Sequence, residues 1–269
     1  MPIVKKIVTT HRHAVKKQEK HLYRPYTPLN FSKIEKQAHM LADCIESRFE
    51  ELVHVLLEYE SYEVVLDETK RTLDLLRNLK ENKQYFRLRV GSVVTFLPRN
   101  QPLYALACFV IVPSLMANEV HFRVPQSMKH FYPKLLAILE INKYFPNIKV
   151  SHSQRTEFLC EHTALRVNPK TKETFPVTDV VIFTGTPVHA DQLRMIFDQR
   201  TLFITNGAGH NPVVVSDDAN LQEAIEAVLT LQLYNQGQDC AAPNAILVHT
   251  RIFNDFRRML RDEIRAVRV

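Results

Sequence analysis

The pattern of apolar and polar positions predicts a helical lead-in followed by alternating strands and helices. From residue 31 to about residue 83, apolar residues recur at intervals of three and four, which is typical of amphipathic helices, with a second helix over 64–79. Beyond this region, apolar runs of strand length occur at 93–97, 120–124, 148–151, 180–184 and 202–205. Helical patterns separate them near 103–117, 128–142, 188–199 and 219–234. Such alternation predicts an α/β fold in which crossover helices wrap a parallel sheet.

Polar residues follow two of the predicted strands, at the ends where open parallel sheets bind ligands. Gly185, Thr186 and Pro187 come directly after the strand 180–184, so the backbone donors of the next helix could face a phosphate. A plain strand-to-helix turn also explains one glycine. Another glycine-bearing turn, 206–212, follows the strand 202–205, and residues 217–219 are the predicted cap of the next helix.

Length and cysteine content place the chain among soluble proteins of a reducing compartment. The chain has 269 residues, of which 45% are hydrophobic, enough to bury a core in one or two domains. Its four cysteines are far apart and form no CxxC pair, so neither a disulfide framework nor a metal site is predicted. No apolar run reaches the roughly 18 residues of a membrane span. We therefore expect a cytoplasmic protein.

The positive charge belongs to the start of the chain. Residues 1–30 hold seven of the 35 Lys and Arg residues and only one of the 29 Asp and Glu residues, so residues 31–269 carry 28 of each. The basic arm 1–30 is interpreted as a solvated tail, with a subunit-contacting arm or a transit-like segment as alternatives. Because the remainder has no excess of positive charge, a nucleic-acid partner is not expected.

Two polar segments carry candidate chemistry. The segment 235–240 reads Asn-Gln-Gly-Gln-Asp-Cys and places Cys240 in a polar turn after a predicted helix, the kind of setting in which a thiolate acts as a nucleophile. Asn100 lies between Pro98 and Pro102, where a rigid carboxamide could donate a hydrogen bond to an oxyanion. The alternatives are a small core thiol and a turn asparagine. Together the two segments suggest carbonyl chemistry through a thiol.

Five segments in the same order resemble the aldehyde dehydrogenase superfamily, and the likeness runs from about residue 33 to the end. The first, 98–103, is similar to the family's Pro-Trp-Asn-x-Pro-Leu segment, with Arg99 in place of the tryptophan. The other four segments are 118–125, 183–186, 206–212 with its continuation 217–221, and 235–240. The last of these matches the family's nucleophile motif at every fixed position. The resemblance implies a Rossmann-like parallel sheet with flanking helices.

The resemblance also implies roles for individual residues. Cys240 would attack an aldehyde or thioester carbonyl, and Asn100 would stabilise the oxyanion together with the backbone amide of Cys240. Thr184, Gly185 and Thr186 would border a nicotinamide dinucleotide. Arg123 would contact its adenosine ribose and could meet a 2′-phosphate, while no acidic residue is found at 125–127. The choice between NAD and NADP stays open.

Asn206 departs from the family pattern. Most members carry a glutamate there that activates water, and a carboxamide cannot take a proton at neutral pH. CoA is therefore a candidate acyl acceptor or donor, as in the family's CoA-acylating members. The alternative is a catalytically impaired or truncated protein of this fold that acts as a binding or interaction module.

The charge distribution and the resemblance together predict three parts: the basic arm 1–30, a helical lead-in with the NAD(P)-binding domain over 31–234, and the start of an incomplete catalytic domain over 235–269. Family members continue well beyond this point, whereas the chain stops at Val269 within an apolar stripe formed by Ile252, Phe256, Leu260 and Ile264. We expect a truncated chain with little or no dehydrogenase activity of its own. Its apolar surface predicts a homo-oligomer or binding of a missing C-terminal half.

Overall fold

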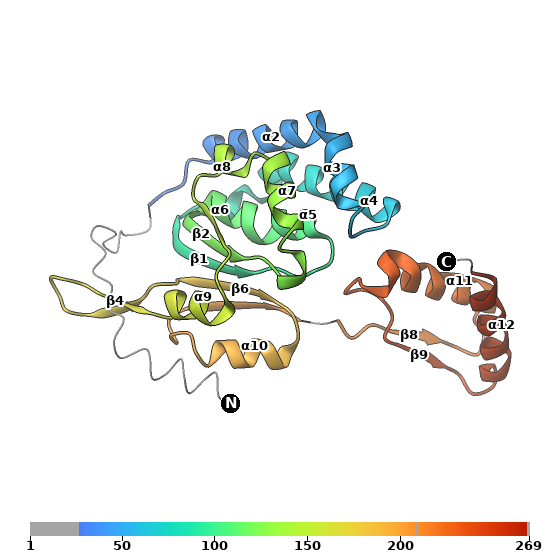
Figure 1. Ribbon diagram of the computed structural model, residues 1–269. Helices are drawn as coiled ribbons and strands as arrows, with labels where there is room; N and C mark the ends of the chain where they lie inside the picture. The colour runs from blue at the N-terminus through green and yellow to red at the C-terminus, as the bar shows by residue number, and fades with distance from the viewer. Residues whose placement is uncertain (1–26, 208, 268–269) are drawn as a thin grey trace. The chain divides into compact units, whose positions relative to one another are not determined.

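The computed structural model describes residues 27–207 and 209–267, and the chain divides into two compact units at Gly207 (Figure 1). Each unit is described by itself. The predicted basic arm, apart from residues 27–30, lies outside the described residues. No helix in the described ranges is long and apolar enough to cross a membrane.

A five-stranded parallel sheet of order β3-β2-β1-β6-β7 forms the centre of the first unit. The strands are β1 (Val90–Phe96), β2 (Ala117–Arg123), β3 (Ile148–Ser151), β6 (Val180–Thr184) and β7 (Leu202–Asn206). The prediction of a parallel sheet is confirmed, with all five strands at the expected places. The strand order reverses between β1 and β6, which makes the carboxyl edge of these two strands a topological switch point.

Helices cover both faces of this sheet (Figure 1). One face carries α2 (Phe31–Ser47), α3 (Phe49–Leu56), α4 (Tyr62–Arg77), α5 (Pro102–Leu106), α6 (Val112–Met116), α7 (Phe131–Ile138) and α8 (Ile141–Tyr144). The other carries α9 (Arg155–His162) and α10 (Pro187–Arg194). The short turns η1 (Leu79–Tyr85) and η3 (Gln126–Met128) and the hairpin of β4 (Leu165–Val167) with β5 (Thr174–Pro176) complete the unit. The sequence pattern did not predict α9 or the hairpin, because these elements are short and bury few side chains.

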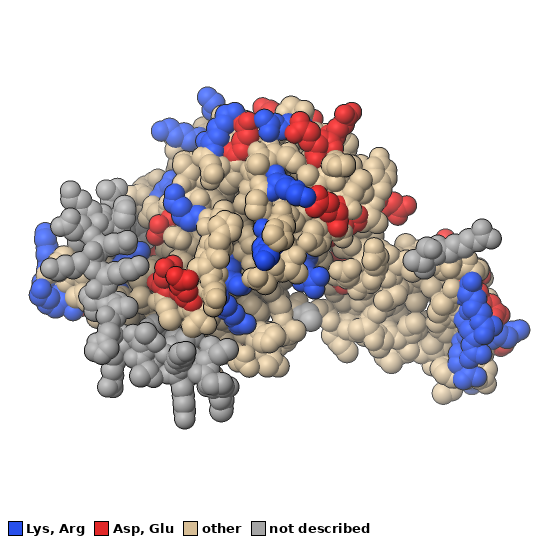
Figure 2. All heavy atoms as spheres, viewed as in Figure 1, with Lys and Arg blue, Asp and Glu red and all other residues tan. Residues whose placement is uncertain are grey.

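Two apolar cores hold these layers together. The larger lies between the sheet and α2–α8 and contains Leu41, Phe122 and Tyr132, which are completely buried. The smaller, under α9 and α10, contains Phe158 and Phe183. On the face of the first unit in Figure 2, basic and acidic side chains intermingle over α2 to α4. This distribution agrees with the equal numbers of acidic and basic residues in 31–269.

The predicted helix over 103–117 is interrupted by the π-helical turn η2 (Ala107–Ile111) between α5 and α6. Pro113 has no backbone N–H, so it cannot donate to the carbonyl of Phe109 one turn earlier. The hydroxyl of Thr95, a buried residue of β1, donates to the Phe109 carbonyl at 2.7 Å instead. Proline therefore alters the helix, and a strand side chain satisfies the released acceptor.

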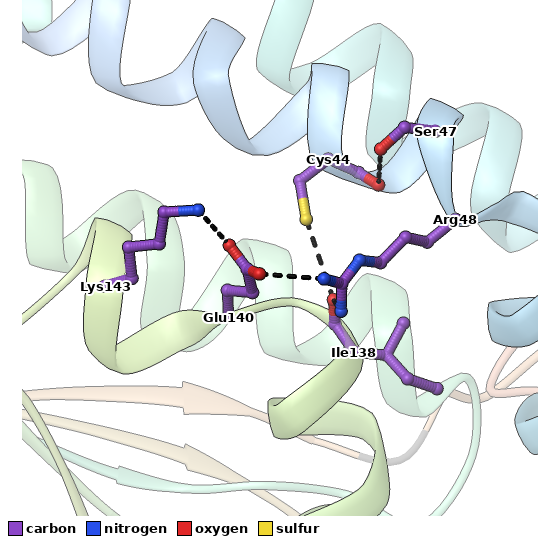
Figure 3. A network of polar contacts seen from close by, with 6 residues as sticks. All are labelled: Cys44, Ser47, Arg48, Ile138, Glu140 and Lys143. Carbon is purple, nitrogen blue, oxygen red and sulfur yellow. Dashed lines mark hydrogen bonds and ion pairs between the residues drawn. The ribbon is translucent and has the colours of Figure 1, made fainter.

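The predicted helix over 128–142 is also divided, at Glu140, whose φ of 47° lies in the left-handed region. A polar network at this bend joins α2 to the turn between α7 and α8 (Figure 3). Arg48 donates to the Ile138 carbonyl at 3.3 Å and to Glu140 at 2.8 Å, while Lys143 pairs with Glu140. The Cys44 thiol also points to the Ile138 carbonyl, 3.6 Å away. These contacts stabilise a backbone conformation that is uncommon for glutamate.

The second unit consists of a parallel pair of strands and two helices. They are β8 (Pro212–Val215), α11 (Leu221–Leu233), the turn η4 (Tyr234–Gly237), β9 (Ala245–Val248) and α12 (Phe253–Ala266). Its core contains Val215, Ile225 and Phe256. Thus α11, which the sequence interpretation placed in the dinucleotide-binding domain, packs within the second unit. The side chain of Asn220 caps α11, so the predicted cap at 217–219 is wrong by one residue.

Apolar side chains of the second unit remain on its surface. Val214 and Leu247 are register partners in β8 and β9, and they are 72% and 56% exposed. In the predicted apolar stripe of α12, Phe256 is buried, whereas Ile264 is 55% exposed. Association through this surface stays a prediction.

Glu60, in the turn between α3 and α4, and Glu68 of α4 hold the loop after β1. The backbone N–H of Gln101 donates to Glu60 at 2.8 Å, and the N–H groups of Leu103 and Tyr104 donate to one oxygen of Glu68 at 3.1 and 3.2 Å. Glu68 is completely buried. Burial, with the charge of Glu60 as a smaller cause, raises the pKa of Glu68 from 4.5 to about 8. The first backbone donors of α5 are thus satisfied by a buried carboxyl group.

We predict that Glu68→Gln removes a pH dependence of stability. Because the folded-state pKa is raised, the folded chain binds more protons than the unfolded chain between pH 4.5 and about 8. The stabilisation by Glu68 is complete below pH 4.5 and is lost as the pH rises through about 8, with a limiting slope of about 1.4 kcal/mol per pH unit. Urea unfolding from pH 5 to 9 measures the difference between the two proteins.

Glutamine keeps an oxygen that can accept from Leu103 and Tyr104, so the variant should gain stability relative to wild type as the pH rises. Glu63→Gln, at an exposed position of the same helix, is the control and should follow wild type. A constant difference between Glu68→Gln and wild type across this range would contradict the prediction.

Candidate functional site

Four of the predicted site residues lie along the carboxyl edge of the first unit's sheet. Arg123 and Thr184 are the last residues of β2 and β6, and Asn206 is the last residue of β7. Asn100 lies in the loop between β1 and α5, at the carboxyl end of the central strand. Since parallel strands end at the same edge, the fold places these residues along the side where such sheets bind ligands.

Thr184, Gly185 and Asn206 are in direct contact. Thr184 and Asn206 are register partners, and the Asn206 amide donates to the Thr184 hydroxyl at 3.5 Å, the outer limit of a hydrogen bond. The Gly185 N–H donates to the Asn206 carbonyl at 3.0 Å. The position predicted to replace a catalytic base is therefore adjacent to the predicted dinucleotide-binding turn.

The turn from β6 to α10 leaves no room for a larger residue at Gly185. A Cβ atom there would lie 2.7 Å from Cζ of Phe183, whose ring is buried in the core beneath α9 and α10. Thr186 is the N-cap residue of α10, and its hydroxyl lies 3.0 Å from Nδ1 of His189. Glycine followed by a helix start allows the backbone to approach a bound phosphate closely.

Arg123 is accompanied by residues of the turn from β3 to α9. Its Nε donates to the Ser153 carbonyl at 3.2 Å. Burial is the main cause that lowers the pKa of Arg123, and the charge of Arg155 is the second. The hydroxyl oxygens of Ser151 and Ser153 are 2.8 Å apart. From the sequence, Arg123 was predicted as a site residue, but Ser151 and Ser153 were not. The pairing register that brings β3 beside β2 cannot be read from the local sequence pattern.

Asn100 is half-buried, and contacts of the next residue determine the path of its loop. Gln101 has a φ of 47°, which is rare outside glycine and asparagine. Besides the hydrogen bond of its N–H to Glu60, its side-chain oxygen accepts from Arg71 at 2.9 Å. The sequence analysis missed Glu60 and Glu68 here, since their contacts lie 41 and 35 residues away along the chain.

Cys240 is exposed and lies in the second unit, in a turn of unusual backbone geometry. Three consecutive residues, Asn235, Gln236 and Gly237, have φ angles of 49°, 54° and 71°. The Asn211 amide donates to the Cys240 carbonyl at 2.6 Å. Asn211 and Gly209 were not predicted to act here, although both lie in the turn 206–212 that the sequence analysis singled out.

Gly209 and Asn244 complete the support of the Cys240 turn. A Cβ atom on Gly209 would lie 2.4 Å from the Cys240 carbonyl oxygen, so glycine is required for this approach. Asn244 donates from its side chain to the Gly209 carbonyl at 3.1 Å and accepts from the Asn211 N–H at 3.2 Å. The chain segment before β8 thus holds the cysteine turn through its main chain and leaves the thiol accessible.

The other cysteines differ from Cys240. Cys44 is buried and Cys108 is partly buried, and burial raises the pKa of both thiols. Cys160 is partly buried beside the smaller core of the first unit. Within the described ranges, no group of three or more His, Cys, Asp or Glu side chains could hold a metal ion. Because Asn100 and Cys240 belong to different units, their convergence stays a prediction.

Comparison with known proteins agrees with the sequence resemblance. Residues 173–269 match the aldehyde dehydrogenase family. The chain is 26% identical to 2-aminomuconic semialdehyde dehydrogenase of Mus musculus over 190 residues, which are 68% of the chain and 36% of that protein. It is 26% identical to succinate-semialdehyde dehydrogenase (NADP(+)) of Mycobacterium avium (strain 104), over 70% of the chain and 38% of that protein. The chain thus spans less than two thirds of these relatives.

Solved structures show the same fold. A double mutant of betaine aldehyde dehydrogenase from Staphylococcus aureus, in complex with NAD+, superposes with a TM-score of 0.71 at 16% identity. The similarity covers 88% of the chain and 49% of the bacterial protein. The resemblance predicted from the five sequence segments is confirmed. The chain therefore carries about half of the aldehyde dehydrogenase fold, and its residues 173–269 match the aldehyde dehydrogenase family.

Proposed function

We propose that the chain contains the dinucleotide-binding part and the nucleophile segment of an NAD(P)-dependent oxidoreductase that acts on aldehydes or acyl thioesters. The observation that carries the proposal is a row of polar residues at the carboxyl edge of the parallel sheet. Arg123 lies on one side of the switch point between β1 and β6, and Thr184, Gly185 and Asn206 lie on the other. Its relatives support the cofactor class, because one is named for NADP(+) and a structural neighbour is bound to NAD+.

The first unit has features that fit a dinucleotide. Gly185 has no side chain to obstruct the approach to the backbone, and the start of α10 offers N–H donors to a phosphate. Arg123 supplies positive charge at the end of β2. When bound, the nicotinamide would exchange a hydride with the substrate carbon.

Cys240 is proposed as the nucleophile. Its thiolate would form a bond to the aldehyde carbon, and the carbonyl oxygen would become an oxyanion that accepts a hydrogen bond from the Asn100 amide. Loss of hydride from this carbon would leave a thioester on Cys240. The exposure of the thiol and the carbonyl contact with Asn211 support this assignment, because they hold the turn while leaving the sulfur accessible.

Asn206 favours release of the acyl group to a thiol, with CoA as the candidate acceptor. A carboxamide cannot remove a proton from water, and the Asn206 amide donates to Thr184. A thiolate needs no such base at the moment of attack: it would form a new carbon–sulfur bond as the Cys240 thiolate leaves. The reverse sequence would reduce an acyl thioester to an aldehyde with a reduced dinucleotide.

A binding module without turnover is the second candidate function. The same contact between Asn206 and Thr184 favours it, since the position expected to hold a base contributes only a donor. Arg99, an exposed residue beside Asn100, adds a second departure from the family pattern. Nucleotide binding with an unreactive Cys240 would identify this function.

We predict that Gly185→Ala weakens dinucleotide binding by about tenfold or more. The added Cβ would lie 2.7 Å from the buried Phe183 ring, so the turn must shift away from its ligand position. Titration of the 269-residue chain with NADH and NADPH, followed by their fluorescence, measures the effect. Gly207→Ala is the matched control, because a Cβ there meets no atom within 4 Å. Equal affinities for wild type and Gly185→Ala would exclude the proposed binding turn.

We predict that iodoacetamide modifies Cys240 faster than any other cysteine of the chain at pH 7.5. Cys240 is exposed, whereas burial raises the pKa of Cys44 and Cys108 and so lowers their thiolate fractions. Peptide mass spectrometry over a time course gives each rate, and Cys240→Ser identifies the rapid phase. If Cys240 reacted no faster than Cys160, the nucleophile assignment would be refuted.

We predict that an acyl group on Cys240 is transferred to CoA faster than to water. An activated ester such as p-nitrophenyl acetate would load the thiol, and intact-protein mass spectrometry would follow loss of the acetyl group with and without CoA. Asn206→Glu should accelerate loss to water by providing a carboxylate base, while Asn206→Gln should not. Equal release with and without CoA in the wild type would contradict thiol-linked release.

A further inference from the structure

Side chains of α4 hold the residues that directly follow Asn100. The N–H groups of Leu103 and Tyr104 converge on one oxygen of Glu68, Oε2, at 3.1 and 3.2 Å. Arg71, on the same helix, donates to the side chain of Gln101 at 2.9 Å, and its guanidinium lies 4.6 Å from the centre of the Tyr104 ring. The path of the chain after Asn100 therefore depends on α4.

The two carboxyl oxygens of Glu68 have different surroundings. Oε2 accepts both backbone hydrogen bonds, whereas Oε1 is buried and has no hydrogen-bond partner within the part of the chain that the structure describes. A buried negative charge is costly unless its oxygens are paired. A proton on Oε1 removes the charge and leaves Oε2 free to accept from the loop. The geometry thus favours the neutral acid.

The charged and titratable groups around Glu68 favour the same form. Burial is the largest cause that raises its pKa to about 8; the charge of Glu60 adds to it, while the two backbone N–H groups and Arg71 oppose it. Arg71 also pairs with Asp67 at 2.9 Å. On the side of α7, burial and the charge of Glu68 raise the pKa of the Tyr132 phenol, which stays neutral. Above pH 8, Glu68 becomes a buried carboxylate near that of Glu60.

We propose that protonated Glu68 is the positioning residue for the Asn100 carboxamide, so that the carbonyl chemistry of the chain weakens when Glu68 ionises. The inference rests on the proposed role of Asn100 as an oxyanion donor. Movement of an ionised Glu68 side chain toward water relieves the cost of its burial, but it releases the N–H groups of Leu103 and Tyr104. An oxyanion donor is effective only when its direction is fixed in advance.

A first experiment observes Asn100 directly. The 269-residue chain, labelled with 15N-asparagine, is titrated from pH 6 to 9 by NMR, and Asn100→Ala identifies the side-chain amide signal. We expect this signal to shift with a midpoint near pH 8 in wild type and to stay constant in Glu68→Gln. Glu63→Gln, at an exposed position of α4, is the matched control and should titrate as wild type. A constant signal in wild type, or the same titration in Glu68→Gln, would overturn the inference.

A second experiment compares two reactions of Cys240 over the same pH range. With p-nitrophenyl acetate, the thiolate bonds to the carbonyl carbon, an oxyanion forms, and p-nitrophenolate then leaves. With iodoacetamide, the sulfur displaces iodide from a methylene carbon and no oxyanion forms. Because both reactions consume the thiolate, the ratio of the two rates is independent of thiol ionisation and measures stabilisation of the oxyanion.

We expect the wild-type ratio at pH 9 to be about one tenth of that at pH 6, since about a tenth of the molecules keep the Glu68 proton one unit above its pKa. Glu68→Gln should show the pH 6 ratio throughout, because its amide oxygen replaces Oε2 as the acceptor. Glu68→Ala should show a lowered ratio at every pH. Circular dichroism at each pH confirms that the variants are folded.

The outcomes separate this inference from the function on which it rests. If Asn100→Ala lowers the ratio but the wild-type ratio does not change with pH, the proposed role of Asn100 is supported and the inference fails. If Asn100→Ala keeps the wild-type ratio at pH 6, the oxyanion role fails, and the inference fails with it.

Discussion

Parallel pairing of the five strands is the constraint on which the first unit depends. In a parallel sheet every carboxyl end falls at one edge, so residues as distant in sequence as Arg123 and Asn206 are placed along the same side. The order β3-β2-β1-β6-β7 then puts the switch point between β1, which leads to Asn100, and β6, which leads to Gly185. The polar edge exists because apolar side chains on both sheet faces are covered by helices.

Buried polar contacts fix the path of the main chain in the loops that follow the strands. Glu60 and Glu68 accept backbone donors where β1 passes into α5, and Thr95 supplies a donor to the carbonyl that Pro113 leaves unsatisfied. In an apolar interior an unsatisfied backbone group is costly, so each contact restricts the main chain to one path. In the second unit, the Asn211 side chain holds the Cys240 turn in the same way, by donating a hydrogen bond to the Cys240 carbonyl. Both candidate catalytic loops are therefore held in large part through their backbones.

The sequence predicted the strands well because each is a short, continuous apolar run, such as 180–184, bounded by turn residues. It also singled out Thr184, Gly185 and Cys240 as candidate site residues, because their signals are local motifs, and their roles stay predictions. Glu60 and Glu68 were missed for a physical reason: their roles come from partners on another element, and only the helix packing reveals those partners. The helix over 103–117 was predicted as continuous because periodicity records apolar positions and not the hydrogen bond that Pro113 removes.

Two residues at the carboxyl edge of the sheet concern different points of the proposed chemistry. Asn206 lies beside the proposed dinucleotide turn at the end of β7, and in the proposed chemistry its carboxamide would affect how an acyl group is released. Arg123 lies at the end of β2, on the other side of the switch point, and in the proposed function it would contribute to dinucleotide binding. The role proposed for Asn206 concerns transfer of a proton, whereas the role proposed for Arg123 concerns binding of the dinucleotide. Neither role therefore requires the other. A chain that binds a dinucleotide without turnover would use Arg123 for binding alone.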